Sequence, residues 1–98
     1  MPNRSTKVTN NPAQHRYELS GDGTLLGIAR YQPQGENILV FTHTEIDSNQ
    51  EGQGYGSQLA RGALDDARRT GKRVVARCEF IAAYIDSHPE YRELLAEA

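Results

Sequence analysis

The chain has 98 residues, enough for one domain with a modest hydrophobic core and too few for a second. Its formal net charge of -2 gives no general reason to expect a nucleic-acid partner, which normally needs a basic face. A single cysteine excludes an internal disulfide and a cysteine-rich zinc site, and we expect no metal site.

The N-terminus has no apolar signal core, and no apolar run approaches the roughly 20 residues that a membrane span requires. Together with the lone cysteine, which suits a reducing compartment, this indicates a cytoplasmic protein with no membrane partner. Residues 1–13 are rich in Asn, Thr, Ser and Pro, so burial cannot offset the entropy lost on ordering them. They are predicted to be a disordered tail, and residues 14–98 are predicted to be the folded domain.

The first half of the folded domain is predicted to be a hairpin followed by a third strand. Residues 15–19 and 24–31 pair across a turn at residues 20–23, whose Ser-Gly-Asp-Gly sequence suits a hairpin. Residues 37–46 form the most apolar strand, and this strand should therefore be central.

Alternation along residues 37–46 divides their side chains between two faces of the sheet. One face carries Ile38, Val40, Thr42, Thr44 and Ile46. The other face carries Leu39, Phe41, His43 and Glu45. An imidazole and a carboxylate are therefore expected on the same side, near the C-terminal end of the strand.

Three alternate glycines, Gly52, Gly54 and Gly56, come directly before a run with helical periodicity. Glycine lets the backbone approach a ligand closely, and the first amides of a helix are unpaired and carry partial positive charge. The segment is therefore either an anion-binding helix start that could hold a pyrophosphate, or a flexible loop before an ordinary helix. The helix is expected to stop at Gly71.

Residues 74–78 are a short apolar strand, and the order strand, helix, strand implies a right-handed parallel crossover beside residues 37–46. A second helix over residues 79–87 is predicted from the spacing of Phe80, Ile81, Tyr84 and Ile85. A terminal helix should begin at Pro89 and continue to about residue 97. The predicted fold is α/β, with a mixed, mostly antiparallel sheet of about four strands and two or three helices.

Six short motifs follow one another along the chain: His43-Thr44-Glu45, Glu51-Gly52-Gln53-Gly54-x-Gly56, Val74-Val75, Cys78-x-Phe80, Ala82-Ala83-Tyr84-Ile85 and His88-Pro89-Glu90-Tyr91. With these motifs, the chain resembles the small single-domain GNAT-like N-acetyltransferase family of the GNAT superfamily. The glycine motif resembles the superfamily signature Arg/Gln-x-x-Gly-x-Gly/Ala, with Glu51 in its first position. The resemblance implies a minimal GNAT-like fold without the extra helices and strands of larger members.

The resemblance also implies acetyl-CoA as the small-molecule acetyl donor. Main-chain amides of the glycine segment would receive its pyrophosphate, and they belong to Gln53, Gly54, Tyr55, Gly56 and Ser57. The pantetheine arm would lie in a gap between the two parallel strands, lined by Thr44, Glu45 and Ile46. Cys78 would lie near the thioester, and Tyr84 is the nearest candidate for the acid that protonates the departing thiolate.

Each of the remaining polar candidates has two possible roles. Cys78 is either a thiol that attacks the thioester or a small buried hydrophobe. His43 is either the base that deprotonates an ammonium substrate or a structural strand residue. Glu45 would orient His43 or act as the base through water. We favour direct transfer over an acetyl-cysteine intermediate, because His43 on the other strand should be held away from the sulfur.

The predicted function is transfer of an acetyl group from acetyl-CoA to an amine. A protein or peptide lysine is a suitable acceptor, because the site of so small a domain must be open. The alternative is a non-catalytic module that binds or senses CoA or acyl-CoA. Release of the CoA thiol in the presence of amines would separate the two.

Overall fold

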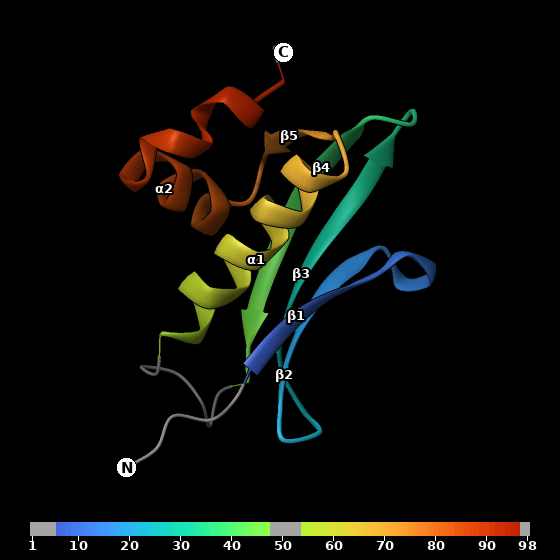
Figure 1. Ribbon diagram of the computed structural model, residues 1–98, viewed down its shortest axis with the longest axis vertical. Coiled ribbons are helices and arrows are strands. Elements are labelled where there is room, and N and C mark those ends of the chain that lie inside the picture. The colour runs from blue at the N-terminus through green and yellow to red at the C-terminus, as the bar shows by residue number, and fades with distance from the viewer. Residues whose placement is uncertain (1–5, 48–53, 97–98) are drawn as a thin grey trace.

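A computed structural model describes residues 6–47 and 54–96, which form a two-layer α/β domain (Figure 1). One layer is a five-stranded sheet in the order β1-β2-β3-β4-β5. Its strands are β1 (Thr6–Asn11), β2 (Arg16–Gly21), β3 (Thr24–Gln34), β4 (Ile38–Ile46) and β5 (Arg73–Ala76). Neighbouring strands are antiparallel except for β4 and β5, which are parallel. The predicted mixed, mostly antiparallel sheet is confirmed, with one strand more than expected.

The other layer is helical and covers one face of the sheet (Figure 1). It consists of α1 (Tyr55–Arg69), α2 (Glu79–Ser87) and the 3₁₀ helix η3 (Pro89–Leu94), while a short 3₁₀ turn, η1 (Pro12–Gln14), joins β1 to β2. The helix α1 is the crossover between β4 and β5, and it buries the apolar stripe Leu59, Ala60, Ala63, Leu64 and Ala67. Just after α1, Gly71 adopts a left-handed conformation with φ of 76°, as a helix stop requires.

The tail predicted for residues 1–13 is wrong from Thr6 onward. The strand β1 pairs with β2 along its whole length. Val8 packs against Gly62 of α1, where an added Cβ would lie only 2.5 Å from Val8 Cγ2. Polar side chains of β1 also form hydrogen bonds with α1, β2 and β3. The strand is therefore ordered by ladder hydrogen bonds and polar contacts rather than by apolar burial, and residues 1–5 lie outside the described residues.

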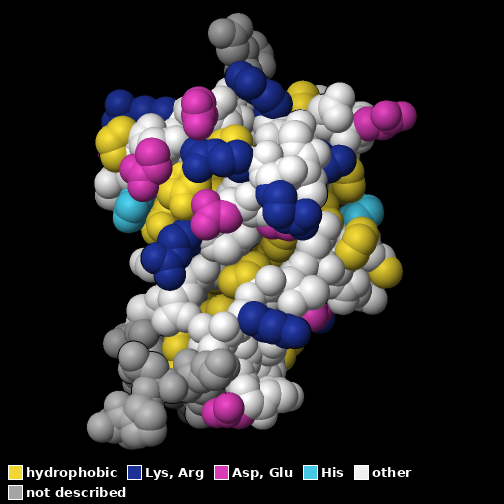
Figure 2. Space-filling view, viewed as in Figure 1, with side chains coloured by type: hydrophobic (Ala, Val, Ile, Leu, Met, Phe, Trp, Pro, Cys, Tyr) yellow, Lys and Arg dark blue, Asp and Glu magenta, His cyan; other side chains and the backbone are white. Residues whose placement is uncertain are grey.

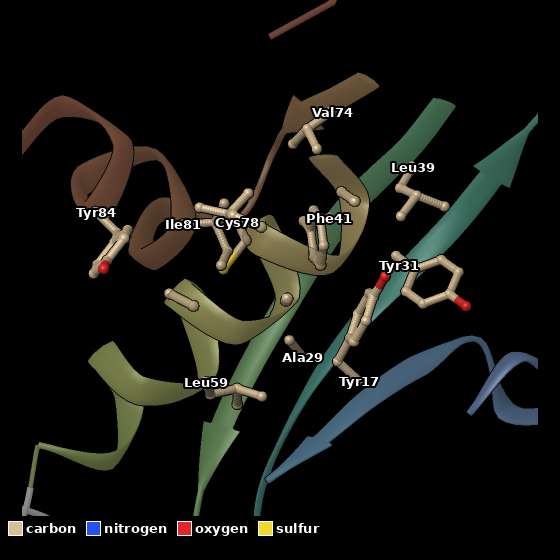
Figure 3. Packing of buried hydrophobic residues seen from close by; sticks show 14 of the residues in the cluster. Tyr17, Ala29, Tyr31, Leu39, Phe41, Leu59, Val74, Cys78, Ile81 and Tyr84 are labelled. Atoms are coloured by element: carbon tan, nitrogen blue, oxygen red, sulfur yellow. The ribbon is translucent and has the colours of Figure 1, made fainter. Parts of the chain in front are cut away.

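The hydrophobic core lies between the sheet and the helices (Figure 3). Tyr17, Tyr31 and Phe41 form an aromatic cluster, with ring centroids 5.5 Å, 6.1 Å and 6.0 Å apart. The Tyr17 hydroxyl donates a hydrogen bond of 2.8 Å to Asp66 Oδ2 on α1. This cluster therefore connects three strands of the sheet to the first helix.

The opposite face of the sheet, which we call the outer face, carries none of the described helices (Figure 1). On the helical side, basic and acidic side chains are interspersed over the helices (Figure 2). The two sides of the molecule therefore differ in what covers the strands. The helical layer buries the inward side chains, whereas the outer face presents strand side chains directly at the surface.

A β-bulge at Thr42 interrupts the alternation of β4. Two consecutive residues of β3 pair with His43 and Phe41, so that Thr42 is an extra residue on β4. Phe41 faces the core before the bulge, and Ile46 packs against the core after it. The strict alternation predicted for residues 37–46 is therefore wrong, because one extra residue exchanges the two faces of a strand.

Candidate functional site

The parallel strands β4 and β5 are paired over only part of β4, and we call the place where their pairing stops the gap. Their pairing ends with Phe41 opposite Ala76. The backbone amides of Arg77 and Cys78 both donate to the carbonyl oxygen of Phe41, at 3.0 Å and 2.9 Å, and the chain then turns into α2. The strand β4 continues to Ile46 with β3 on its other side. Beyond Phe41, this edge of β4 has no strand neighbour in the described part of the chain.

Cys78 stands at the end of this gap as the N-cap residue of α2. It is only 6% exposed, and its Sγ lies 3.2 Å from the Oγ1 of Thr44 on β4. In Figure 3 the sulfur points into the space between α2 and β4. Two residues predicted to line the site from opposite walls are therefore in direct contact.

His43 and Glu45 form the predicted pair, but on the outer face. His43 Nε2 lies 2.9 Å from Glu45 Oε2, and the two side chains are 54% and 63% exposed. Thr44 lies between them in sequence and contacts Cys78 on the covered side. The strand thus separates the imidazole and carboxylate from the thiol. Ile46 faces the core and covers Gly27, where an added Cβ would lie 2.6 Å from Ile46 Cδ1.

The glycine segment does begin a helix. Gly54 is the N-cap residue of α1 and has a left-handed backbone with φ of 77°, which favours glycine. The first intrahelical bond runs from Gln58 N to Gly54 O at 3.2 Å. The amides of the first turn, those of Tyr55, Gly56 and Ser57, therefore have no intrahelical acceptor. Gln53 and the earlier positions of the motif lie outside the described residues.

Phe80 closes over this helix start. An added Cβ at Gly56 would lie 2.8 Å from Phe80 Cζ, so the small residue lets the aromatic ring rest on the first turn of α1. Phe80 is nevertheless 42% exposed. A hollow of about 210 Å³ lies beside it, between α1 and α2, and is lined by Ser57, Phe80, Ala83, Tyr84, Ser87 and His88. The start of α1 thus borders a cavity with an aromatic wall.

Tyr84 lines this hollow and does not contact Cys78; its ring is clearly separate from the sulfur in Figure 3. Burial raises the pKa of its hydroxyl above the usual value, so the group stays protonated at neutral pH. The His88 ring stacks on Tyr84 with centroids 3.9 Å apart. His88 Nδ1 lies 2.8 Å from the Tyr84 carbonyl oxygen, which can only accept, so Nδ1 carries a hydrogen. His88 is therefore a packing residue in this structure.

Sequence reasoning missed two features of the site. Its periodicity groups Phe80 with Ile81, Tyr84 and Ile85, yet those three are buried and Phe80 is not. The glycine at position 56 is the available signal, because a helix position without a Cβ suggests that something packs closely on it. The Thr44 side chain was also missed, since only its backbone was expected to take part. No simple pattern identifies that contact, which depends on the bulge.

Within residues 6–47 and 54–96, no group of three or more His, Cys, Asp or Glu side chains is placed to hold a metal ion. In the same part of the chain, no helix has the length and apolar character needed to cross a membrane.

Residues 16–94 match a family model described as GCN5-related N-acetyl-transferase. The NMR solution structure of a GCN5-like protein from Staphylococcus aureus has the same fold, with a TM-score of 0.68. The alignment covers 94% of this chain and 89% of that chain at 17% sequence identity. No curated protein sequence matches the chain significantly.

Proposed function

The chain belongs to the GCN5-related N-acetyltransferase family, and on this premise we propose that it transfers an acetyl group from acetyl-CoA to a primary amine. The observation that carries the proposal is the gap between β4 and β5. Cys78 and Thr44 meet at this gap, and the free amides of α1 begin on the same side of the sheet. The thioester and the pyrophosphate of one acetyl-CoA molecule could therefore bind on the same side of the sheet.

The donor would bind to backbone groups at both ends of this region. Amides of Tyr55, Gly56 and Ser57, with Gly54 before them, suit a pyrophosphate because they lack intrahelical acceptors and carry the positive end of the helix dipole. The unpaired edge of β4, over residues 44–46, suits the amide groups of pantetheine as an added strand would. The donor thus requires few specific side chains.

In the proposed reaction, the amine nitrogen attacks the thioester carbonyl carbon, a C–N bond forms and the C–S bond breaks. Starting from an ammonium group, the nitrogen loses two protons in all. We assign removal of the first to the pair of His43 and Glu45 on the outer face, because an imidazole beside a carboxylate can act as a general base. The second is balanced by the proton that the CoA sulfur takes, for which the protonated hydroxyl of Tyr84 is the assigned source.

Calorimetry with acetyl-CoA tests the donor site, and α1 supplies a matched pair of glycines. Gly54 and Gly71 flank the helix, and both have left-handed backbones, with φ of 77° and 76°. Valine at either position should cost similar backbone strain, about 1–2 kcal/mol. We expect Gly54→Val to abolish binding, because a side chain blocks the approach of the phosphates, and Gly71→Val to leave the affinity unchanged. Equal affinities of the two variants would contradict the donor site.

Thiol release from acetyl-CoA across a panel of amines tests the transfer itself. We expect at least one primary amine to accelerate release. If every amine fails while calorimetry still shows binding, the chain is a non-catalytic CoA-binding module, and transfer is wrong.

A further inference from the structure

A hollow of about 470 Å³ lies on the outer face, across β2, β3 and β4. It is lined by one residue of β2, five of β3 and three at the end of β4: Arg16, Leu25, Leu26, Gly27, Ile28, Arg30, Glu45, Ile46 and Asp47. A cavity of this size suits a small molecule. It lies on the opposite side of β4 from Cys78, so it is separate from the hollow beside Phe80.

The strand register arranges the charges of this hollow in rows. Arg16 pairs with Arg30, and Arg30 pairs with His43, so three basic side chains stand side by side across three strands. The next row is Glu18, Ile28 and Glu45, which places acids on either side of an isoleucine. One end of the hollow is therefore basic, and Glu45 and Asp47 make the other end acidic.

Within the described residues, the basic row is only partly neutralised. Arg16 forms an ion pair of 2.8 Å with Glu18, and His43 is paired with Glu45. The Arg30 guanidinium forms no ion pair or hydrogen bond with any described residue. Like charges directly opposite one another on a sheet are destabilising. An anion bound between Arg16 and Arg30 would relieve that repulsion, and a guanidinium holds a carboxylate through two parallel hydrogen bonds.

Ile28 gives the hollow an apolar floor. It is only 7% exposed although none of the described helices covers the outer face, because the long side chains of the two charged rows surround it. A ligand that matches all three features carries an anionic group, a short apolar body and a cationic group. An α-amino acid has this composition.

We propose that this hollow is the acceptor site and takes small primary amines that carry a carboxylate, such as free amino acids. The inference rests on the proposed transfer function and names its substrate class. Arg30 and Arg16 hold the carboxylate, while Glu45 receives the ammonium group. Glu45 is adjacent in sequence to Thr44, whose hydroxyl contacts the Cys78 sulfur on the other side of the strand. To reach a thioester in the gap, the amine held by Glu45 would pass around the unpaired edge of β4.

Binding is tested by NMR titration of the ¹⁵N-labelled protein, saturated with CoA, using free amino acids and their primary amides. The amides keep the amine but lack the carboxylate. We expect the amino acids to shift the backbone amide resonances of Ile28, Arg30 and Glu45. The matched amino acid amides should bind more weakly, by about tenfold or more. Equal affinity of the two forms, or shifts only elsewhere, would overturn the proposal.

Arg30→Gln should remove the preference for the carboxylate. Arg92→Gln is the matched control, because Arg92 is an exposed arginine on η3 that pairs with Asp86 at 3.6 Å, away from the outer face. In assays of thiol release, we expect Arg30→Gln to raise the KM for the amino acid about tenfold to a hundredfold and to leave the KM for acetyl-CoA unchanged. An unchanged KM for the amino acid would contradict the role of Arg30.

The proposal and the transfer function fail in different ways. If peptide lysines drive thiol release while amino acids do not bind, the transfer function stands and this acceptor class is wrong. If amino acids bind in the hollow but no amine drives release, transfer fails and the hollow is not an acceptor site.

Discussion

The two faces of the sheet carry different chemistry although they share the same strands. On the covered face, Cys78 and Thr44 are in contact beneath the helical layer. On the outer face, His43 and Glu45 form an exposed pair. The bulge at Thr42 decides this distribution, because one extra residue places successive side chains of β4 on the sides where they are found. The bulge thus places the His43 imidazole on the opposite face from the Cys78 thiol, although His43 is next in sequence to Thr44, which the thiol contacts.

The largest effect on stability should come from truncating a buried side chain on the covered face. Phe41 is fully buried in the aromatic cluster, so Phe41→Ala should lower the free energy of unfolding by about 3–5 kcal/mol. Val40 is its neighbour on β4 and lines a hollow on the outer face. Val40→Ala should therefore cost only about 1 kcal/mol or less. Urea denaturation of both variants measures the difference.

Similar losses in the two variants would show that the faces do not differ in packing as the structure indicates. Because a domain of this size is stabilised by only about 5–15 kcal/mol, a loss of this size is a large part of the total stability of Phe41→Ala. Circular dichroism of the variant before titration checks that it is folded.

A smaller loss of stability is expected from removing the hydrogen bond between Tyr17 on the covered face and Asp66 on α1. Burial, and then the hydrogen bond to Asp66, raise the pKa of the Tyr17 hydroxyl well above its usual range. Burial likewise raises the pKa of Tyr91 to about 12. The folded protein therefore holds these protons more tightly than the unfolded chain does. Their stabilising contribution is complete below about pH 10 and is lost as the pH rises above that value.

Tyr17→Phe should cost about 1 kcal/mol at neutral pH, since Asp66 keeps its hydrogen bond with Arg69. Above about pH 10, the stability of the variant should fall less steeply than that of the parent, because phenylalanine has no hydroxyl to lose a proton. Urea denaturation at a series of alkaline pH values measures both slopes. Parallel slopes would contradict the assignment to Tyr17, and Tyr91→Phe provides a second variant with the same expected sign.

Much of the fold follows from periodicity in the sequence. The stripe of α1 and the turn at residues 20–23 are local signals, and the crossover rule then places β5 beside β4. The strand β1 could not be predicted in this way, because Val8 is its one apolar side chain and its order depends on pairing with β2. Composition describes what a segment can bury, but it does not show which edge the segment can pair with.

The site was predictable in its parts and not in its arrangement. The motifs of the family identify Thr44, Cys78 and the start of α1, and the structure brings the first two together. The separation of His43 from the thiol depends on the bulge, which is a property of the pairing between β3 and β4 rather than of either strand. The exposed position of Phe80 likewise depends on its contact with Gly56, which is distant in sequence.

The smallest effect is expected for Cys78→Ala. If transfer is direct, the amine attacks the thioester and the enzyme contributes position, so the thiol is dispensable. The covalent route needs a base for the thiol. The sulfur contacts the hydroxyl of Thr44, which is not a base at neutral pH, while His43 lies on the outer face.

Turnover of Cys78→Ala should therefore stay within a few-fold of the parent, with unchanged affinity for acetyl-CoA and a loss of stability of about 1 kcal/mol. Cys78→Ser, which keeps the size of the side chain, separates packing from chemistry. Mass spectrometry after incubation with acetyl-CoA alone gives the decisive measurement. A stoichiometric acetyl adduct on Cys78 that an amine discharges at the catalytic rate would establish the covalent route, and the two faces of the sheet would then have to communicate through the gap beside β4.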